Sequence, residues 1–103
     1  MDIQIKKGLL DACVMYALTG GESYGYKIIN DLKGIIDISE STLYPILKRL
    51  EAGGALKTYS RQFNGRLRRY YYLTPEGRAK FDEYKNDFEE VIKIYKSIFG
   101  EKT

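Results

Sequence analysis

The order of the structural elements is clearest in residues 41–77, which read STLYPILKRLEAGGALKTYSRQFNGRLRRYYYLTPEG. Three leucines spaced four and three residues apart predict a helix that begins at Ser39 or Ser41 and ends at about Ala52. Two glycines separate it from the runs 55–63 and 66–73, whose Tyr, Thr and Leu content predicts strands. Thr74-Pro75 then predicts the start of another helix, because Thr is a good N-cap and Pro suits the first helical position.

The turn between the two predicted strands is Asn64-Gly65. A two-residue hairpin turn requires positive φ at both central positions, which Asn and Gly adopt more readily than other residues. This turn places Arg61 opposite Arg68 on one face of the hairpin. Like charges that face each other are destabilising, and either a bound phosphate or separation of the side chains into water would relieve the repulsion.

Two further helices are predicted before this segment. Apolar residues recur at helical spacing over 3–19, where Gly20-Gly21 ends the pattern, and over 24–33, where Ser23 is the expected N-cap. Three helices followed by a basic hairpin are typical of a winged helix-turn-helix. The predicted fold is therefore mostly α with a small β-hairpin. It comprises a winged helix-turn-helix domain over 1–74 and a C-terminal dimerisation helix over 75–103.

The last predicted helix, over about 75–99, has an apolar face that continues to its end. Its apolar residues alternate in spacing between three and four positions, which is the pattern of an a/d seam. We expect a second copy of the chain to cover this face; the alternative is a helix that folds back entirely onto its own domain. The residues expected in the homodimer interface are Leu9, Cys13, Phe81, Tyr84, Phe88, Val91, Ile92, Tyr95, Ile98 and Phe99.

The composition excludes most familiar catalytic and metal chemistry. The 103 residues include no His and one Cys, which excludes His-dependent catalytic triads and zinc sites built from His or four Cys. The carboxylates form no convincing catalytic pair and no phosphate-binding loop is present, so we expect neither an enzyme nor a cofactor. Cys13 is expected to be a buried structural thiol rather than a redox sensor, in a cytoplasmic protein without a membrane-spanning helix.

The net charge of +3 hides an uneven distribution. Residues 48–80 hold nine Lys and Arg against two Asp and Glu, a net charge of +7, whereas the segments on either side each carry −2. A concentrated basic segment favours a polyanion such as double-stranded DNA as the partner. The alternative is a solvated charged hairpin in a winged-helix module that binds another protein.

The third helix has short hydroxyl side chains and then long cations on the side opposite its leucines. Hydroxyls and a helix N-terminus suit phosphate or base contacts, and the cations reach guanine edges or phosphates. Pro45 interrupts the helical hydrogen-bond pattern, and its ring either lies against DNA or bends the helix. From this helix the residues expected to contact DNA are Ser41, Thr42, Pro45, Lys48 and Arg49. From the basic hairpin they are Arg61, Arg66 and Arg68.

Several short motifs follow one another between residues 8 and 80. They are Tyr24-Gly25-Tyr26, Thr42-Leu43-Tyr44-Pro45, Arg49-Leu50-Glu51, and Gly65-Arg66 continuing through Arg68-Arg69-Tyr70-Tyr71 to Leu73-Thr74 and Gly77. In this combination the chain resembles the PadR-like family of bacterial transcriptional regulators, in its short form with a single C-terminal helix. The resemblance implies a dimeric winged helix-turn-helix repressor with recognition helix 39–52 and wing 55–73, in which the C-terminal and first helices form the dimer.

The resemblance also adds residues to the expected DNA surface. It implies that Tyr24 and Tyr44 pack or contact phosphate where the helices meet DNA, and that Asn64 and Gly65 form the wing tip. Lys27 departs from the family pattern, because it places a positive charge where Glu is frequent.

Two other departures concern specificity and ligands. Ser41 stands where many family members have Gly, which changes the contact at the start of the recognition helix. Some short members bind flat aromatic drugs between paired tryptophans in a central channel of the dimer, and this chain has no Trp. Tyr84, Phe88 and Tyr95 either line such a channel for a small aromatic inducer or form ordinary apolar core.

Overall fold

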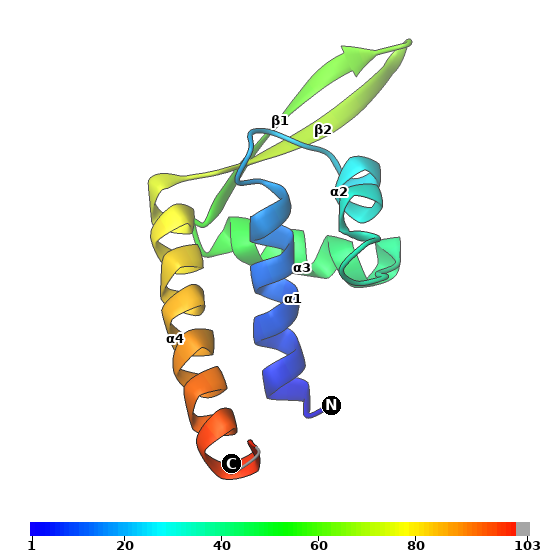
Figure 1. Cartoon of the computed structure of the whole chain (residues 1–103). Helices are drawn as coiled ribbons and strands as arrows, with labels where there is room; N and C mark the ends of the chain where they lie inside the picture. The colour runs from blue at the N-terminus through cyan, green and yellow to red at the C-terminus, as the bar shows by residue number, and fades with distance from the viewer. Residues whose placement is uncertain (101–103) are drawn as a thin grey trace.

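The structure, a computed structural model, describes residues 1–100 and contains four helices and a two-stranded antiparallel hairpin (Figure 1). The elements are α1 (Ile3–Ala17), α2 (Gly25–Leu32), α3 (Glu40–Ala52), β1 (Leu56–Phe63), β2 (Arg66–Leu73) and α4 (Pro75–Phe99). The prediction of a mostly helical fold with a small hairpin is confirmed. The last three residues of the predicted segment 75–103 lie outside the described residues.

The hydrophobic core lies where α1, α2 and α3 meet the start of β1. The helical spacing of apolar residues directs one face of each helix inward. The core's most deeply buried side chains are Val14, Met15, Ile28, Leu32, Leu43, Leu47, Leu50 and Leu56. Burying a Leu or Ile side chain contributes roughly 1.5–3 kcal/mol relative to exposure, so these contacts hold α3 firmly by its leucine face. The opposite face of α3 is left to solvent.

Local capping sets the start of three helices. Side-chain oxygens of Asp2, Ser39 and Thr74 accept hydrogen bonds from backbone amides two or three residues further on, at α1, α3 and α4. For α3 the cap is thus Ser39 rather than Ser41. Pro75 occupies the first turn of α4, where the missing amide hydrogen breaks no helical bond.

The start of α2 differs from the prediction. The N-cap position is Tyr24, whose side chain makes no capping hydrogen bond. Ser23 instead pairs through its backbone with Tyr71 of β2, with N···O distances of 3.0 and 2.8 Å. The buried Ser23 hydroxyl has no hydrogen-bond partner among the described residues. The predicted cap at Ser23 is therefore wrong, because a long-range backbone pairing replaces the local one.

β1 and β2 form the predicted hairpin, which projects from the helical body (Figure 1). At the turn, Asn64 has φ 49° and Gly65 has φ 77°. The register places Arg61 opposite Arg68, as the two-residue turn predicts. The turn and the register are both confirmed, because local turn chemistry determines them.

The base of the hairpin is joined to α4 through Thr74 and Gly77. The Thr74 hydroxyl lies 2.6 Å from the carbonyl oxygen of Gly54 and 3.1 Å from that of Ala55, and it accepts the Gly77 amide. Gly77 is buried against the Ala55 carbonyl, and a Cβ at this position would overlap that oxygen. The absence of a side chain at Gly77 therefore allows α4 to start directly at the wing base.

α4 runs beside α1 and away from the wing (Figure 1). The start of α1 and the end of α4 lie together at the end of the molecule that is remote from the hairpin (Figure 1). The molecule is elongated, with principal extents of 61 × 26 × 23 Å. Within residues 1–100, no helix combines the length and apolar character needed to cross a membrane.

Candidate nucleic-acid interface

The exposed face of α3 carries most of the helix residues that the sequence assigns to DNA. They are Ser41, Thr42, Tyr44, Pro45 and Lys48. At the helix start, the Ser39 hydroxyl lies 2.9 Å from that of Ser41 and 3.1 Å from that of Thr42. These hydroxyls adjoin the first turn of α3, where the Thr42 amide is bonded to Ser39 and the amides of Glu40 and Ser41 have no carbonyl partner within the helix. The arrangement suits a phosphate oxygen, since donors and the positive end of the helix dipole converge there.

Pro45 lies inside α3 and is exposed. Because it has no amide hydrogen, the carbonyl of Ser41 lacks its usual helical donor. The helix nevertheless continues to Ala52, since the leucines on its buried face hold it in the core. The Pro45 ring is therefore presented on the same polar face as Lys48.

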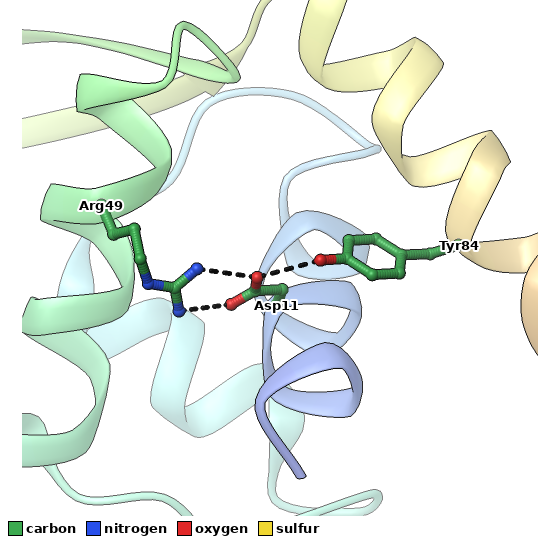
Figure 2. Close-up of polar contacts among 3 residues, drawn as sticks. All are labelled: Asp11, Arg49 and Tyr84. Atoms are coloured by element: carbon green, nitrogen blue, oxygen red, sulfur yellow. Dashed lines mark hydrogen bonds and ion pairs between the residues drawn. The ribbon is translucent and has the colours of Figure 1, made fainter. Parts of the chain in front are cut away.

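Lys48 and Arg49 are neighbours in sequence but have different environments. Lys48 is exposed and makes no ion pair within residues 1–100. Arg49 reaches back to α1, where its guanidinium donates to both carboxylate oxygens of Asp11 at 2.8 and 2.6 Å (Figure 2). The buried carboxylate therefore holds the Arg49 guanidinium, and of these two expected DNA contacts only Lys48 is left without a carboxylate partner in residues 1–100.

Asp11 connects three helices through one carboxylate. Its side chain is 2% exposed, and it accepts a hydrogen bond from the Tyr84 hydroxyl of α4 at 3.1 Å as well as those from Arg49 (Figure 2). Hydrogen bonding to Asp11 raises the pKa of Arg49, and burial raises the pKa of Tyr84, so both donors keep their protons at neutral pH. Helical periodicity alone does not reveal this site, although the charged Asp11 between Leu10 and Val14 in an apolar stripe is a signal for it.

Arg61 and Arg68 face each other across the hairpin, and neighbouring groups compensate the positive charge of Arg61. Its Cζ lies 4.5 Å from the ring centre of Tyr70, and a guanidinium nitrogen lies 3.8 Å from the Glu22 carboxylate. Hydrogen bonding to Arg61 lowers the pKa of Tyr70. These cation–π and ion-pair contacts stabilise the Arg61 guanidinium in its position opposite Arg68. These contacts offset the repulsion between the two arginines without a bound phosphate, and a phosphate contact at this pair stays a prediction.

Arg68 joins the wing to the start of α2. Its Cζ lies 3.9 Å from the ring centre of Tyr24 and 3.7 Å from that of Phe63. Tyr44 of α3 packs at the same junction, where a Cβ at Gly25 would meet its hydroxyl. Residues of α2, α3 and β2 line a cavity of about 430 Å³ at this junction. α3 and the wing thus meet at one surface.

The wing exposes cations that contact no carboxylate in the described part of the chain. They include Arg66 beside the turn, Arg69 and Lys57. Lys27 differs, because its ammonium lies 2.7 Å from the carboxylate of Asp31 one turn later in α2. On the face formed by α2, α3 and the wing, the charges of Lys48 and of these hairpin cations are thus uncompensated, whereas that of Lys27 is paired.

Two contacts that the sequence analysis did not foresee hold the wing in place. Glu22 accepts a hydrogen bond from the Tyr59 hydroxyl and faces Arg61. Directly after it, Ser23 pairs with Tyr71 of β2. No local pattern indicates these pairs, because Glu22 and Tyr59 are 37 residues apart in the chain.

The residues predicted for a dimer interface fall into two groups. One group is half-buried between α1 and α4 and contains Leu9, Cys13, Phe81, Tyr84 and Phe88. The other lies on the second half of α4, is more than half exposed, and contains Val91, Ile92, Tyr95, Ile98 and Phe99. The apolar seam of α4 is therefore covered by its own chain only over its first half.

A model of the PadR-like family of transcriptional regulators matches residues 14–83, from α1 into α4. The chain belongs to this family. Its members are transcriptional regulators, not enzymes. A transcriptional regulator of Mycobacterium tuberculosis is 46% identical over 56 residues, which cover 54% of this chain and 52% of that protein. The match thus spans about half the length of that relative.

Solved structures of bacterial transcriptional regulators share the whole fold. A transcriptional regulator from Clostridium thermocellum has a TM-score of 0.85 and 28% identity, with 96% of this chain and 98% of that chain covered. A PadR-like transcription factor from Bacteroides fragilis has a TM-score of 0.82 and 32% identity, with 92% and 94% covered. The similarity extends beyond the winged helix into α4, so the fold is the PadR-like winged helix.

Proposed function

We propose that this PadR-like protein is a homodimeric transcriptional repressor that binds a pseudo-palindromic operator in double-stranded DNA. α3 lies in the major groove, and the wing contacts the phosphate backbone or the minor groove. The observation that carries the proposal is the junction of α3 and the wing, where Tyr44 of α3 meets Arg68 and Arg69 of the hairpin around one cavity. The hydroxyls and Lys48 of α3 are exposed on the same helix. Family membership supports DNA over a protein partner.

The proposal assigns different roles to different parts of this surface. Ser41, Thr42 and Lys48 face the base edges and adjacent phosphates, while Tyr44 and Tyr24 pack at the junction of α3, α2 and the wing. The tip at Asn64-Gly65, with Arg66, reaches the backbone or minor groove. Phosphate contacts position a protein on DNA, whereas base contacts supply specificity. Arg61 and Arg68 shape the wing through their aromatic contacts, and Lys27, paired with Asp31, is a further candidate phosphate contact on α2.

The proposed dimer forms through the second half of α4 together with α1. The exposed apolar side chains of α4 support this, because an uncovered stripe of this kind on an elongated molecule needs a partner of similar character. A two-fold dimer presents two copies of α3 to one side of a duplex. The half-sites are then expected about 34 Å apart, or one helical turn of DNA. Repression follows where such a site overlaps a promoter and the bound dimer excludes the polymerase.

Selection of bound duplexes from a random pool tests the proposal. The expected result is enrichment of two inverted half-sites whose centres lie about 34 Å apart. Binding of the selected duplex should weaken steeply with added salt, because phosphate contacts release counterions. If the pool is not enriched and no duplex gives a salt-sensitive shift, the protein-binding alternative is supported instead.

An inducer site is proposed beside the dimer surface. An apolar groove of about 240 Å³ between α1 and α4 is lined in part by Leu9, Cys13, Phe81 and Phe88. Phe88 therefore remains a candidate contact for a small aromatic ligand, whereas the Tyr84 hydroxyl is turned to Asp11. Titration of the protein–operator complex with flat aromatic compounds tests this proposal. Release of DNA with a matching change in tyrosine fluorescence supports it, and unchanged binding across the series contradicts it.

A further inference from the structure

The carboxylate of Asp11 is a buried charge that the proposed DNA surface does not use. It lies in α1 and holds two groups from other helices, the Arg49 guanidinium of α3 and the Tyr84 hydroxyl of α4 (Figure 2). α3 carries the proposed base contacts, and α4 carries the proposed dimer surface. Asp11 therefore connects α3, the proposed DNA-reading helix, to α4, the proposed dimerisation helix.

Stability alone is a weak explanation for this arrangement. The Asp11 carboxylate is buried, whereas the Arg49 side chain is 38% exposed. Such a pair gains little over well-packed apolar side chains, because removing the carboxylate from water is costly. A two-pronged guanidinium–carboxylate contact, however, is directional and fixes the relative orientation of its partners. At Arg49 both prongs are present, at 2.8 and 2.6 Å. The contact thus specifies an angle between α1 and α3 that apolar packing would leave less defined.

A small change in the angle between α1 and α3 would move the proposed DNA-contacting end of α3, because Arg49 and Ser41 lie at opposite ends of that helix. Arg49 lies near the end of α3, next to Lys48, and Ser41 lies at the opposite end of the helix. The eight residue steps from Ser41 to Arg49 span about 12 Å, so a rotation of about 10° around Arg49 moves the Ser41 end by about 2 Å. In α4, Tyr84 stacks on Phe88, with ring centres 6.1 Å apart, just before the exposed half of the helix.

We propose that Asp11 is a positioning residue for DNA recognition: by holding Arg49 and Tyr84 together, it sets the orientation of α3 relative to α4 and thereby the half-site spacing that the dimer accepts. This inference rests on the proposed function, in which α3 binds DNA and α4 forms the dimer. Asp11 and Arg49 act through α3 and need no contact with DNA themselves.

The test uses a variant that replaces the directional contact with apolar packing. In Asp11→Leu/Arg49→Met the net charge is unchanged, so general attraction to DNA is preserved. Affinity is measured for the selected operator, for duplexes whose half-sites are moved apart or together by one and two base pairs, and for a duplex with a single half-site. We expect the wild type to lose at least tenfold in affinity per base pair of displacement, and the variant to lose threefold or less. Its affinity for the single half-site should stay within twofold, and its mass should remain that of the wild-type dimer.

Two milder variants keep the inference testable if the double variant does not fold. Arg49→Lys retains the charge but loses the two-pronged contact, and Tyr84→Phe removes one hydrogen bond while keeping the ring. Each should reduce spacing discrimination, and Arg49→Lys should reduce it more. Unchanged discrimination in the folded variants overturns the inference, even if their melting temperature falls. If the wild-type protein shows no preferred spacing at all, the proposed dimeric DNA binding itself fails, which is a different result.

Discussion

The two ends of this elongated molecule expose opposite kinds of surface. At the wing end, α3 and the hairpin present hydroxyls and cations such as Lys48 and Arg66. At the other end, the second half of α4 presents apolar side chains such as Tyr95 and Ile98. Added salt screens attraction between charges but does not weaken apolar association. The two surfaces therefore suit different partners, and salt should separate their effects.

The contrast also appears within α4 itself. The same apolar spacing runs through the whole helix, yet Phe81 and Phe88 are half-buried against α1 whereas Ile98 and Phe99 are exposed. An apolar pattern predicts that a surface will be covered, but it does not say by which chain. Here the covered half positions α4 on its own domain, and the uncovered half remains for association.

Placing a charge on the apolar end should give the largest effect. Ile98→Asp puts a carboxylate on the exposed seam of α4, where a dimer would bury it in both subunits. An uncompensated buried charge costs about 3–5 kcal/mol, so the dimer should dissociate at micromolar concentration. Light scattering after size-exclusion chromatography measures the mass directly.

Ser97→Asp is the matched control for that variant. It adds the same charge one residue earlier, on the polar side of α4, where the Ser97 hydroxyl donates to the carbonyl of Lys93. The control should keep the mass of the wild type. If Ile98→Asp also keeps the dimer mass, or if the wild type is a monomer, the apolar end is not the dimer surface.

The junction between the two ends should be the next most sensitive place. Gly77→Ala drives a methyl group into the Ala55 carbonyl at the wing base, where only backbone movement can make room. Overpacking of this kind should lower the free energy of unfolding by about 3 kcal/mol, measured by denaturant titration. Gly20→Ala is the control, since nothing lies within 4 Å of a Cβ there. Equal stability of the two variants would show that wing and α4 are not rigidly joined.

The elements that the sequence predicted well are those determined by neighbouring residues. Asn64-Gly65 defines its turn because the positive φ values are a property of the two residues themselves. Thr74 and Pro75 likewise mark the start of α4 through contacts within one helical turn. The fold class, the hairpin register and most helix boundaries could therefore be predicted.

The contacts that the sequence did not reveal join residues far apart in the chain. Helical periodicity placed Arg49 on the side opposite the leucines, but it could not show that its long side chain reaches Asp11, 38 residues away. Ser is a residue type that favours the N-cap position. Ser23 does not cap α2, because its backbone pairs instead with Tyr71 of the distant β2. Side-chain reach and long-range pairing are set by tertiary packing, which periodicity does not encode.

At the charged end, the contrast between Lys48 and Arg49 can be tested directly. Lys48→Ala should weaken operator binding by about 1–3 kcal/mol and relax the sequence preference if Lys48 reads a base. It should leave protein stability unchanged, because Lys48 makes no ion pair in residues 1–100. Affinities for the selected operator and single-base variants measure the effect. Lys85→Ala on α4 removes the same charge as a control, and an equal loss there would mean that Lys48 contributes only net charge.

Arg66→Ala tests the wing tip and should have a smaller effect. It should weaken all sequences alike and flatten the slope of log affinity against log salt by about one unit, as expected for one phosphate contact. The dimer mass measured across the same salt series should not change, because the apolar end responds differently to salt. An unaltered salt slope in Arg66→Ala would remove the wing tip from the DNA contact.

The smallest expected effect concerns Cys13, which reports on whether a partner covers the groove between α1 and α4. Burial raises the pKa of the Cys13 thiol, so it stays protonated to higher pH in the folded chain and forms less of the reactive thiolate. Alkylation by iodoacetamide near pH 8 should therefore be several-fold slower than in denaturant. The rate in Ile98→Asp should lie between these two values, because the groove lined by Leu9, Cys13 and Phe88 then loses its cover. Equal rates in wild type and Ile98→Asp would place the dimer contact further along α4, away from this groove.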